Sequence, residues 1–196
     1  MIIPLVDRIF ENLFFRKLYH MFGGGLLVLG LVFLDRKWFM VLDAIYIFVF
    51  KVFGKRISFA AIGVLLLYFI SNSRFITLET TVIWLVGDGM AALIGAAYGK
   101  KKWPWSTHKT ILGSVAFLLS SILVALPVVS IYIDAPLSIL FILVLAPCLC
   151  ASIIEALPLS FIKDRKADDN LLVILSTGLL LYGLYAVLGT GFQVLK

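Results

Sequence analysis

The sequence predicts an all-α protein, a polytopic membrane helix bundle of about seven transmembrane helices. Hydrophobic residues make up 62% of the 196 residues and the mean hydropathy is +1.10, whereas soluble domains are about 45–50% apolar. Several apolar runs also exceed the roughly 9–11 residues of a membrane β-strand, and a helix satisfies its own backbone polar groups in lipid. No polar stretch is long enough for a soluble domain, so residues 1–196 are expected to form one integral membrane domain.

The predicted helices follow the apolar runs. In chain order these runs are 18–34, 38–53, 57–71, 78–98, 111–133, 136–157 and 171–194. The last four are long enough to cross a bilayer. The second and third are short for a hydrocarbon core of about 30 Å, so they either span a thinned or sheltered region or form a re-entrant pair. The N-terminal segment lacks the pattern of a signal peptide and is expected to stay on the mature protein.

The basic residues predict the orientation of the bundle. If all seven runs span, 13 of the 17 lysines and arginines lie on the N-terminal side and 4 on the other. The positive-inside rule then places the N-terminus and the loops at 51–56, 100–110 and 163–170 in the cytoplasm. A re-entrant pair would put the basic residues at 51–56 inside the membrane or on the wrong side, which favours two real spans. The protein is therefore expected in the cell membrane or the endoplasmic reticulum.

The composition excludes several other classes of protein. Basic loops of a membrane protein explain the net charge of +6, and no soluble surface is available to lie along a nucleic acid. Cys148 and Cys150 lie in an apolar run and are expected to be small buried hydrophobic residues, not a disulfide or a zinc site. No internal repeat supports an inverted-repeat transporter.

Four acidic residues are candidates for chemistry at the cytoplasmic half of the bundle. Asp88 lies well inside an apolar run, and an acid in a membrane helix is costly and is a functional candidate. Glu155 lies near the cytoplasmic end of run 136–157, and Asp168 and Asp169 precede the last run. Carboxylates of this kind hold Mg²⁺ together with substrate phosphates, or deprotonate an alcohol.

Two further acids are given no role in chemistry. Asp43 lies in a short apolar run, where a helix–helix hydrogen bond or an interfacial position would explain it. Glu79 lies at the opposite end of its run from the lysines and is expected to be a surface charge.

A basic loop and a helix start follow Asp88. Gly95 and Gly99 lie on the same helical face as Asp88 and are expected to allow close packing. The loop carries Trp103 and Trp105, which are either interfacial anchors or part of the site. Hydroxyls and backbone amides at a helix start bind anions, and adjacent lysines add charge. The candidate anion-binding residues are Lys100, Lys101, Lys102, Lys109, Thr110, Gly113 and Ser114.

Three blocks of residues resemble the CTP-dependent lipid kinases, namely dolichol kinase, phytol kinase and the CTP-type diacylglycerol kinase. The first is Glu11 followed by Arg16-Lys17-x-x-His20. The second and most specific runs from Gly87-Asp88 through Gly95, Gly99-Lys100, Trp103-Pro104-x-Ser106 and Lys109-Thr110-x-x-Gly113-Ser114. The third is Glu155-Ala156-Leu157-Pro158 followed by Asp168-Asp169-Asn170. One departure is Leu112, where many members have an acidic or small residue. If that acid helps to hold metal, this chain does without it.

The resemblance implies transfer of the γ-phosphate of CTP to the hydroxyl of a membrane lipid alcohol at the cytoplasmic face. Phosphoryl transfer needs mainly charge stabilisation and in-line positioning. Mg²⁺ is the implied cofactor, held by Asp88 and one of Asp168 and Asp169, and the base would be Glu155 or Asp88. The nucleotide would be held by the lysines of the loop with Thr110, Gly113 and Ser114, and the site would be closed by Arg16, Lys17 and His20.

Other functions stay open at this stage. A phosphatidate cytidylyltransferase would use the same nucleotide and metal but would release pyrophosphate. A small membrane transporter would use Asp88 and Glu155 as an ion path, and a packing subunit would bind no CTP. The sequence does not choose among dolichol, polyprenol, phytol, geranylgeraniol and diacylglycerol. A homodimer is compatible with it.

Overall fold

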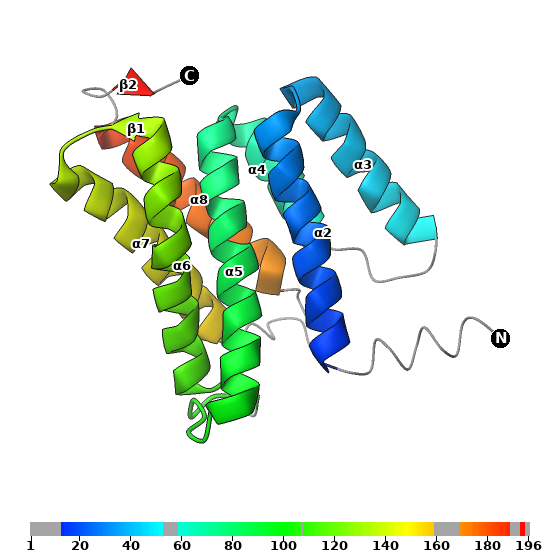
Figure 1. Cartoon of the computed structure of the whole chain (residues 1–196), viewed down its shortest axis with the longest axis vertical. Coiled ribbons are helices and arrows are strands. Elements are labelled where there is room, and N and C mark those ends of the chain that lie inside the picture. The colour runs from blue at the N-terminus through cyan, green and yellow to red at the C-terminus, as the bar shows by residue number, and fades with distance from the viewer. Residues whose placement is uncertain (1–12, 53–58, 107, 159–168, 189–192, 195–196) are drawn as a thin grey trace.

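The structure is a computed structural model that describes residues 13–52, 59–106, 108–158, 169–188 and 193–194. It is an all-helical bundle (Figure 1). The helices are α2 (Leu13–Phe33), α3 (Arg36–Val52), α4 (Phe59–Ser71), α5 (Arg74–Tyr98), α6 (Ile111–Tyr132), α7 (Leu137–Ala156) and α8 (Asp169–Leu188). Two short strands, β1 (Ile133–Asp134) and β2 (Gln193–Val194), pair antiparallel at one end of the bundle.

Four helices are long and apolar enough to cross a membrane, which confirms the prediction that the last four apolar runs form helices of spanning length. They are Arg74–Tyr98, Ile111–Tyr132, Leu137–Ala156 and Asn170–Leu188. Among the described residues, Met21–Phe33 and Phe59–Ser71 form shorter apolar helices. The count of about seven spans and the cytoplasmic N-terminus therefore stay predictions. The last predicted run, 171–194, was too long: α8 ends at Leu188, and Gln193 and Val194 belong to a strand.

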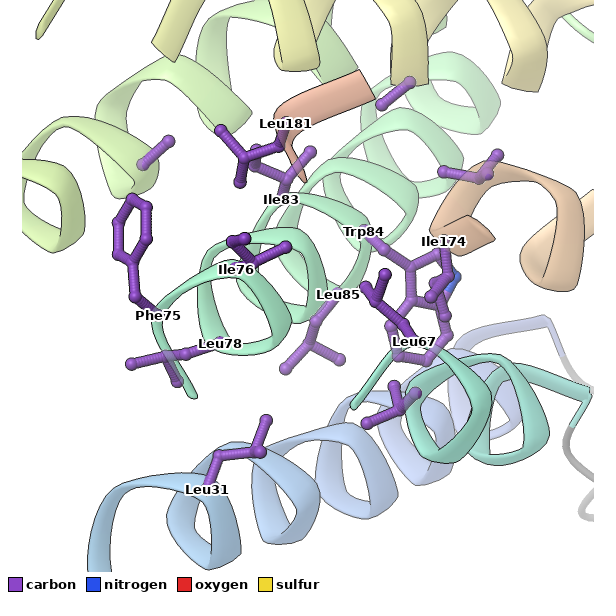
Figure 2. Close-up of a cluster of buried hydrophobic side chains, with 14 of the residues drawn as sticks. Leu31, Leu67, Phe75, Ile76, Leu78, Ile83, Trp84, Leu85, Ile174 and Leu181 are labelled. Carbon is purple, nitrogen blue, oxygen red and sulfur yellow. The ribbon is translucent and has the colours of Figure 1, made fainter. Parts of the chain in front are cut away.

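Helix α5 lies at the centre of the bundle. It contacts α2, α4, α6, α7 and α8, and Figure 2 shows Leu31 of α2, Leu67 of α4 and Ile174 of α8 arranged around it. Its own Ile76, Ile83 and Trp84 are almost completely buried. Five other helices therefore cover α5 on most sides.

This central position corrects the prediction for Glu79. The side chain of Glu79 is fully buried, with 0% exposure, so the prediction of a surface charge was wrong. The predicted run began at 78, whereas α5 begins at Arg74 behind an N-cap in which the Ser73 side chain accepts from the Ile76 amide at 3.3 Å. Glu79 therefore lies in the second turn of a helix that is covered by its neighbours.

Candidate active site

The loop between α5 and α6 is folded on itself by backbone hydrogen bonds. Lys102 and Thr110 form an isolated antiparallel bridge. The amide of Trp103 donates to the carbonyl oxygen of Lys109 at 3.1 Å, and that of Ile111 to the carbonyl oxygen of Lys101 at 3.0 Å. The side chains of Lys100, Lys101 and Lys102 are exposed. The three exposed lysines thus lie on a loop whose backbone is held by its own hydrogen bonds.

Thr110 caps the start of α6. Its backbone is extended, and its Oγ1 accepts from the amide of Gly113 at 3.0 Å, the usual arrangement of a threonine N-cap. The Ile111 amide already donates to Lys101. The backbone amides of Ile111 and Gly113, at the predicted anion-binding helix start, therefore already donate to acceptors within the protein. The exposed lysines are thus better placed than these amides to meet a phosphate.

Glycines let α5 and α6 approach closely beside this cap. A Cβ atom at Gly99 would lie 2.4 Å from both Thr110 Oγ1 and the Gly95 carbonyl oxygen. A Cβ at Gly95 would lie 3.0 Å from Thr110 Oγ1, and one at Gly113 would lie 3.0 Å from the Ala91 carbonyl oxygen. Real Cβ atoms almost never come as close as 2.4 Å. Gly99 is thus tightly constrained where the helices meet.

An ion pair joins the loop to the end of α7. Lys109 Nζ lies 3.3 Å from Glu155 Oε1 and also donates to the carbonyl oxygen of Glu155. The side chains are 23% and 14% exposed, so the pair is largely shielded from solvent. A cation at the C-terminal end of a helix is favoured by the helix dipole. Lys109 therefore both balances Glu155 and caps α7.

The two tryptophans of the loop also bind its neighbours. Trp103 Nε1 donates to Ser114 Oγ of α6, and Trp105 Nε1 donates to the carbonyl oxygen of Ala156 at the end of α7, both at 2.9 Å. The two rings stack with centroids 4.9 Å apart. Ser152 Oγ of α7 donates to the carbonyl oxygen of Ser114 at 3.0 Å. The loop, α6 and α7 therefore form one hydrogen-bonded unit.

Asp88 lies on α5, nearer the middle of the bundle. Its side chain is half-buried. Trp84, one turn earlier on the same face, donates from Nε1 to Asn170 Oδ1 at 2.9 Å. Asn170 is the second residue of α8, so the start of α8 borders this face of α5. Gly89 lies against α2, since a Cβ there would be 3.2 Å from Met21 Sδ.

The structure brings some of the predicted site residues together and leaves others apart. Seven of them surround the Thr110 cap: Gly95, Gly99, Lys109, Thr110, Gly113, Ser114 and Glu155. Asp88 precedes Gly95 by about two turns of α5. The backbone of Arg16, Lys17 and His20 belongs to α2 and that of Asp169 begins α8, but the side chains of these four residues lie outside the described part, as does the whole of Asp168.

For the predicted magnesium site, the structure shows which residue types come together near Asp88, and these can be compared with the ligands that Mg²⁺ prefers. Within the described ranges, no three acidic, histidine or cysteine side chains cluster. The hydrogen bond from Trp84 to Asn170 brings the start of α8, where Asp169 lies, to the face of α5 that carries Asp88. Carboxylates from these two helices would suit Mg²⁺ bound to a triphosphate. The residue types fit the ion, and the site stays a prediction.

Two buried acids have a significance that the sequence analysis missed. Asp43 is 2% exposed and Glu79 is 0% exposed. All four of their carboxyl oxygens lack a hydrogen-bond partner within the described part of the chain. Among the described residues, Asp43 therefore makes no helix–helix hydrogen bond. The position of Asp43 in an apolar run was a sequence signal for its burial. The burial of Glu79 depends on the helices around α5, which the sequence does not display.

Comparison with protein-family models, with curated proteins and with solved structures finds no match for this chain.

Proposed function

We propose that this protein is a lipid kinase that transfers the γ-phosphate of CTP to the hydroxyl of a membrane lipid alcohol. It would act from the cytoplasmic face of a bundle of about seven spans. The observation that best supports the proposal is the ion pair between Lys109 and Glu155. It connects the second and third blocks of the lipid-kinase resemblance, which are far apart in the sequence, at one end of the bundle.

The nucleotide phosphates would meet the exposed Lys100, Lys101 and Lys102. Lysines bind phosphate as point charges, and these three are displayed on a loop fixed by its own hydrogen bonds. Lys109 is committed to Glu155 and to the end of α7. Its proposed role is therefore to hold the loop in place and to add positive potential. Arg16, Lys17 and His20 are proposed to close the site from α2.

The acceptor hydroxyl would reach the same depth from the bilayer. Glu155 or Asp88 is proposed to remove its proton as phosphoryl transfer proceeds. Asp88 and one of Asp168 and Asp169 would hold Mg²⁺, which would neutralise charge on the triphosphate when bound. The preference for CTP rests on the resemblance.

The decisive test is a transfer assay. Purified protein in detergent, with Mg²⁺ and γ-labelled CTP, is offered dolichol, phytol, geranylgeraniol and diacylglycerol. Label on one lipid, with CDP left behind, would support the kinase and name its acceptor. Release of pyrophosphate with phosphatidate as the acceptor would instead indicate a cytidylyltransferase.

The first variant to assay is Asp88→Asn, which keeps the side-chain volume and removes the charge. We expect it to lose nearly all turnover while CTP binding persists through the lysines. Full activity in this variant would rule out the assignment of Asp88 to metal binding or to base catalysis.

One observation favours a second candidate, a small transporter. Glu79 is buried in α5 toward the end opposite the lysine loop. Within the described part of the chain, its oxygens lack hydrogen-bond partners, as do the hydroxyls of Thr80 and Thr177. Acids of this kind occur in proton pathways. Proton flux in liposomes that disappears in Glu79→Gln would favour transport, whereas lipid phosphorylation that persists in Glu79→Gln would favour the kinase.

A further inference from the structure

Helices α2 and α3 enclose an apolar groove. Its volume is about 410 Å³. Each end has a close contact between the helices: a Cβ at Gly30 would lie 3.0 Å from the Phe39 ring, and one at Gly23 would lie 2.8 Å from Tyr46 Oη. Leu26, Leu29 and Leu42 line the groove and are about half exposed, so it opens to the surface of the bundle. In a bilayer a lipid chain could enter it sideways.

One charged side chain interrupts this apolar lining. Asp43 lines the groove, is 2% exposed, and has no hydrogen-bond partner for either carboxyl oxygen among the described residues. Burying a polar group without a partner costs free energy, and more so in a membrane. A groove with an apolar wall and a single unpartnered carboxyl suits a ligand with an apolar chain and one hydrogen-bonding head.

We propose that the α2–α3 groove binds a single-chain lipid alcohol, with its hydroxyl on the carboxyl of Asp43. A hydroxyl can donate and accept, so it pairs with a carboxyl whether that group is ionised or protonated. An ammonium would require the ionised form. The volume lies toward the lower end of the range of about 300–1,000 Å³ for small-molecule sites, which favours one chain over two.

The groove ends close to a contact between α2 and α5. Its Gly23 end lies two residues from Met21, which packs on Gly89 beside Asp88. The assignment of the bound alcohol as the phosphate acceptor rests on the proposed function. Its binding in the groove does not.

Photo-crosslinking without nucleotide tests the binding. The protein in detergent is labelled with a hexadecanol that carries a diazirine on its chain, and the labelled peptides are identified by mass spectrometry. We expect label on the α2 and α3 residues that line the groove. Hexadecanol should compete about tenfold better than hexadecyl methyl ether, the scale of one hydrogen bond to a carboxyl group. Asp43→Leu should abolish this preference.

A matched pair of variants controls for folding and for non-specific partition. Leu26→Trp should block the groove and prevent labelling, whereas Leu119→Trp, at a comparably exposed position of α6, should not. Leu26 is 50% exposed and Leu119 is 62% exposed. Thermal unfolding of both variants verifies that they remain folded.

Several results would overturn the inference. Label confined to other helices, or undiminished label in Leu26→Trp, would exclude the groove as the site. Equal competition by the methyl ether in the unmodified protein would exclude the hydroxyl contact. Stronger competition by hexadecylamine would identify a cationic amphiphile as the ligand instead.

The outcome separates this inference from the proposed function. Groove labelling without any phosphate transfer from CTP would support the lipid-binding site and contradict the proposed kinase activity. Transfer to hexadecanol with an unchanged kcat/KM in both Asp43→Leu and Leu26→Trp would leave the kinase in place and show that the groove is not its acceptor site.

Discussion

The lysine-loop end of the bundle and the α2–α3 groove differ in whether their buried polar groups have hydrogen-bond partners. At the loop end, Lys109 pairs with Glu155, Thr110 caps α6, and both tryptophan N–H groups have acceptors. In the groove, the Asp43 carboxyl is more deeply buried than this ion pair but has no hydrogen-bond partner within the described residues.

The difference indicates which polar groups serve the fold. A buried polar group that is fully hydrogen-bonded stabilises its surroundings, whereas an unpartnered one is a cost that a protein retains for another reason. The loop end is therefore expected to lose stability when its polar groups are changed. Substitution of Asp43 in the groove is expected to weaken ligand binding without lowering the stability of the protein. Four variants test this contrast, from the largest expected effect to the smallest.

Gly99→Ala should have the largest effect on stability. Its Cβ would lie 2.4 Å from two oxygen atoms, one of them on the backbone, and overpacking of this kind costs about 1–3 kcal/mol or more. Urea or SDS titration of the purified protein would measure the loss. The controls are Gly25→Ala and Gly183→Ala, where a Cβ meets nothing within 4 Å and where alanine should gain up to about 1 kcal/mol in a helix. Equal behaviour of all three variants would contradict the close packing.

Lys109→Met should follow, with a loss of about 1–3 kcal/mol. This lies between the cost for exposed ion pairs and that for fully buried ones, since the two side chains are 23% and 14% exposed. Glu155 would keep its charge without its salt bridge. The double variant Lys109→Met/Glu155→Gln should recover part of the loss, and a double-mutant cycle would measure the coupling. No coupling between the two positions would contradict the ion pair.

Thr110→Ala should cost about 1 kcal/mol through loss of the N-cap. Thr110→Ser keeps an oxygen that can accept from the Gly113 amide and should retain most of the stability. Hydrogen exchange at the first turn of α6 would report the effect locally, since the Gly113 amide now donates to Thr110 Oγ1. Unchanged exchange in Thr110→Ala would show that the cap does not stabilise the helix start.

Asp43→Leu should show the smallest change, with stability preserved or raised by up to about 1 kcal/mol. It removes an unpartnered carboxyl from an apolar groove. Asp43→Asn, which leaves a polar group in place, should show no such gain. Differential scanning calorimetry in the same detergent compares the two. A clear loss of stability in Asp43→Leu would reveal a structural role for the carboxyl and would remove the contrast between the regions.

Much of the fold followed from local pattern. The apolar runs at 38–53 and 57–71 correspond to α3 (Arg36–Val52) and α4 (Phe59–Ser71). An apolar segment in lipid is expected to be helical because a helix satisfies its own backbone hydrogen bonds. The loop between α5 and α6 was also predictable. Its lysines, Pro104 and Gly99 exclude it from both the membrane core and a continuous helix.

The sequence by itself determined that this protein is helical with helices apolar enough to cross a membrane, roughly where those helices lie, and that a basic loop follows α5. Only the tertiary structure decided that Lys109 meets Glu155, that Glu79 is buried, and that Asp43 faces an apolar groove. Helix formation depends on neighbouring residues along the chain, which the sequence displays. The partner of a side chain depends on which faces of distant helices pack together. The apolar pattern, which varies little around α6, α7 and α8, does not encode that choice locally.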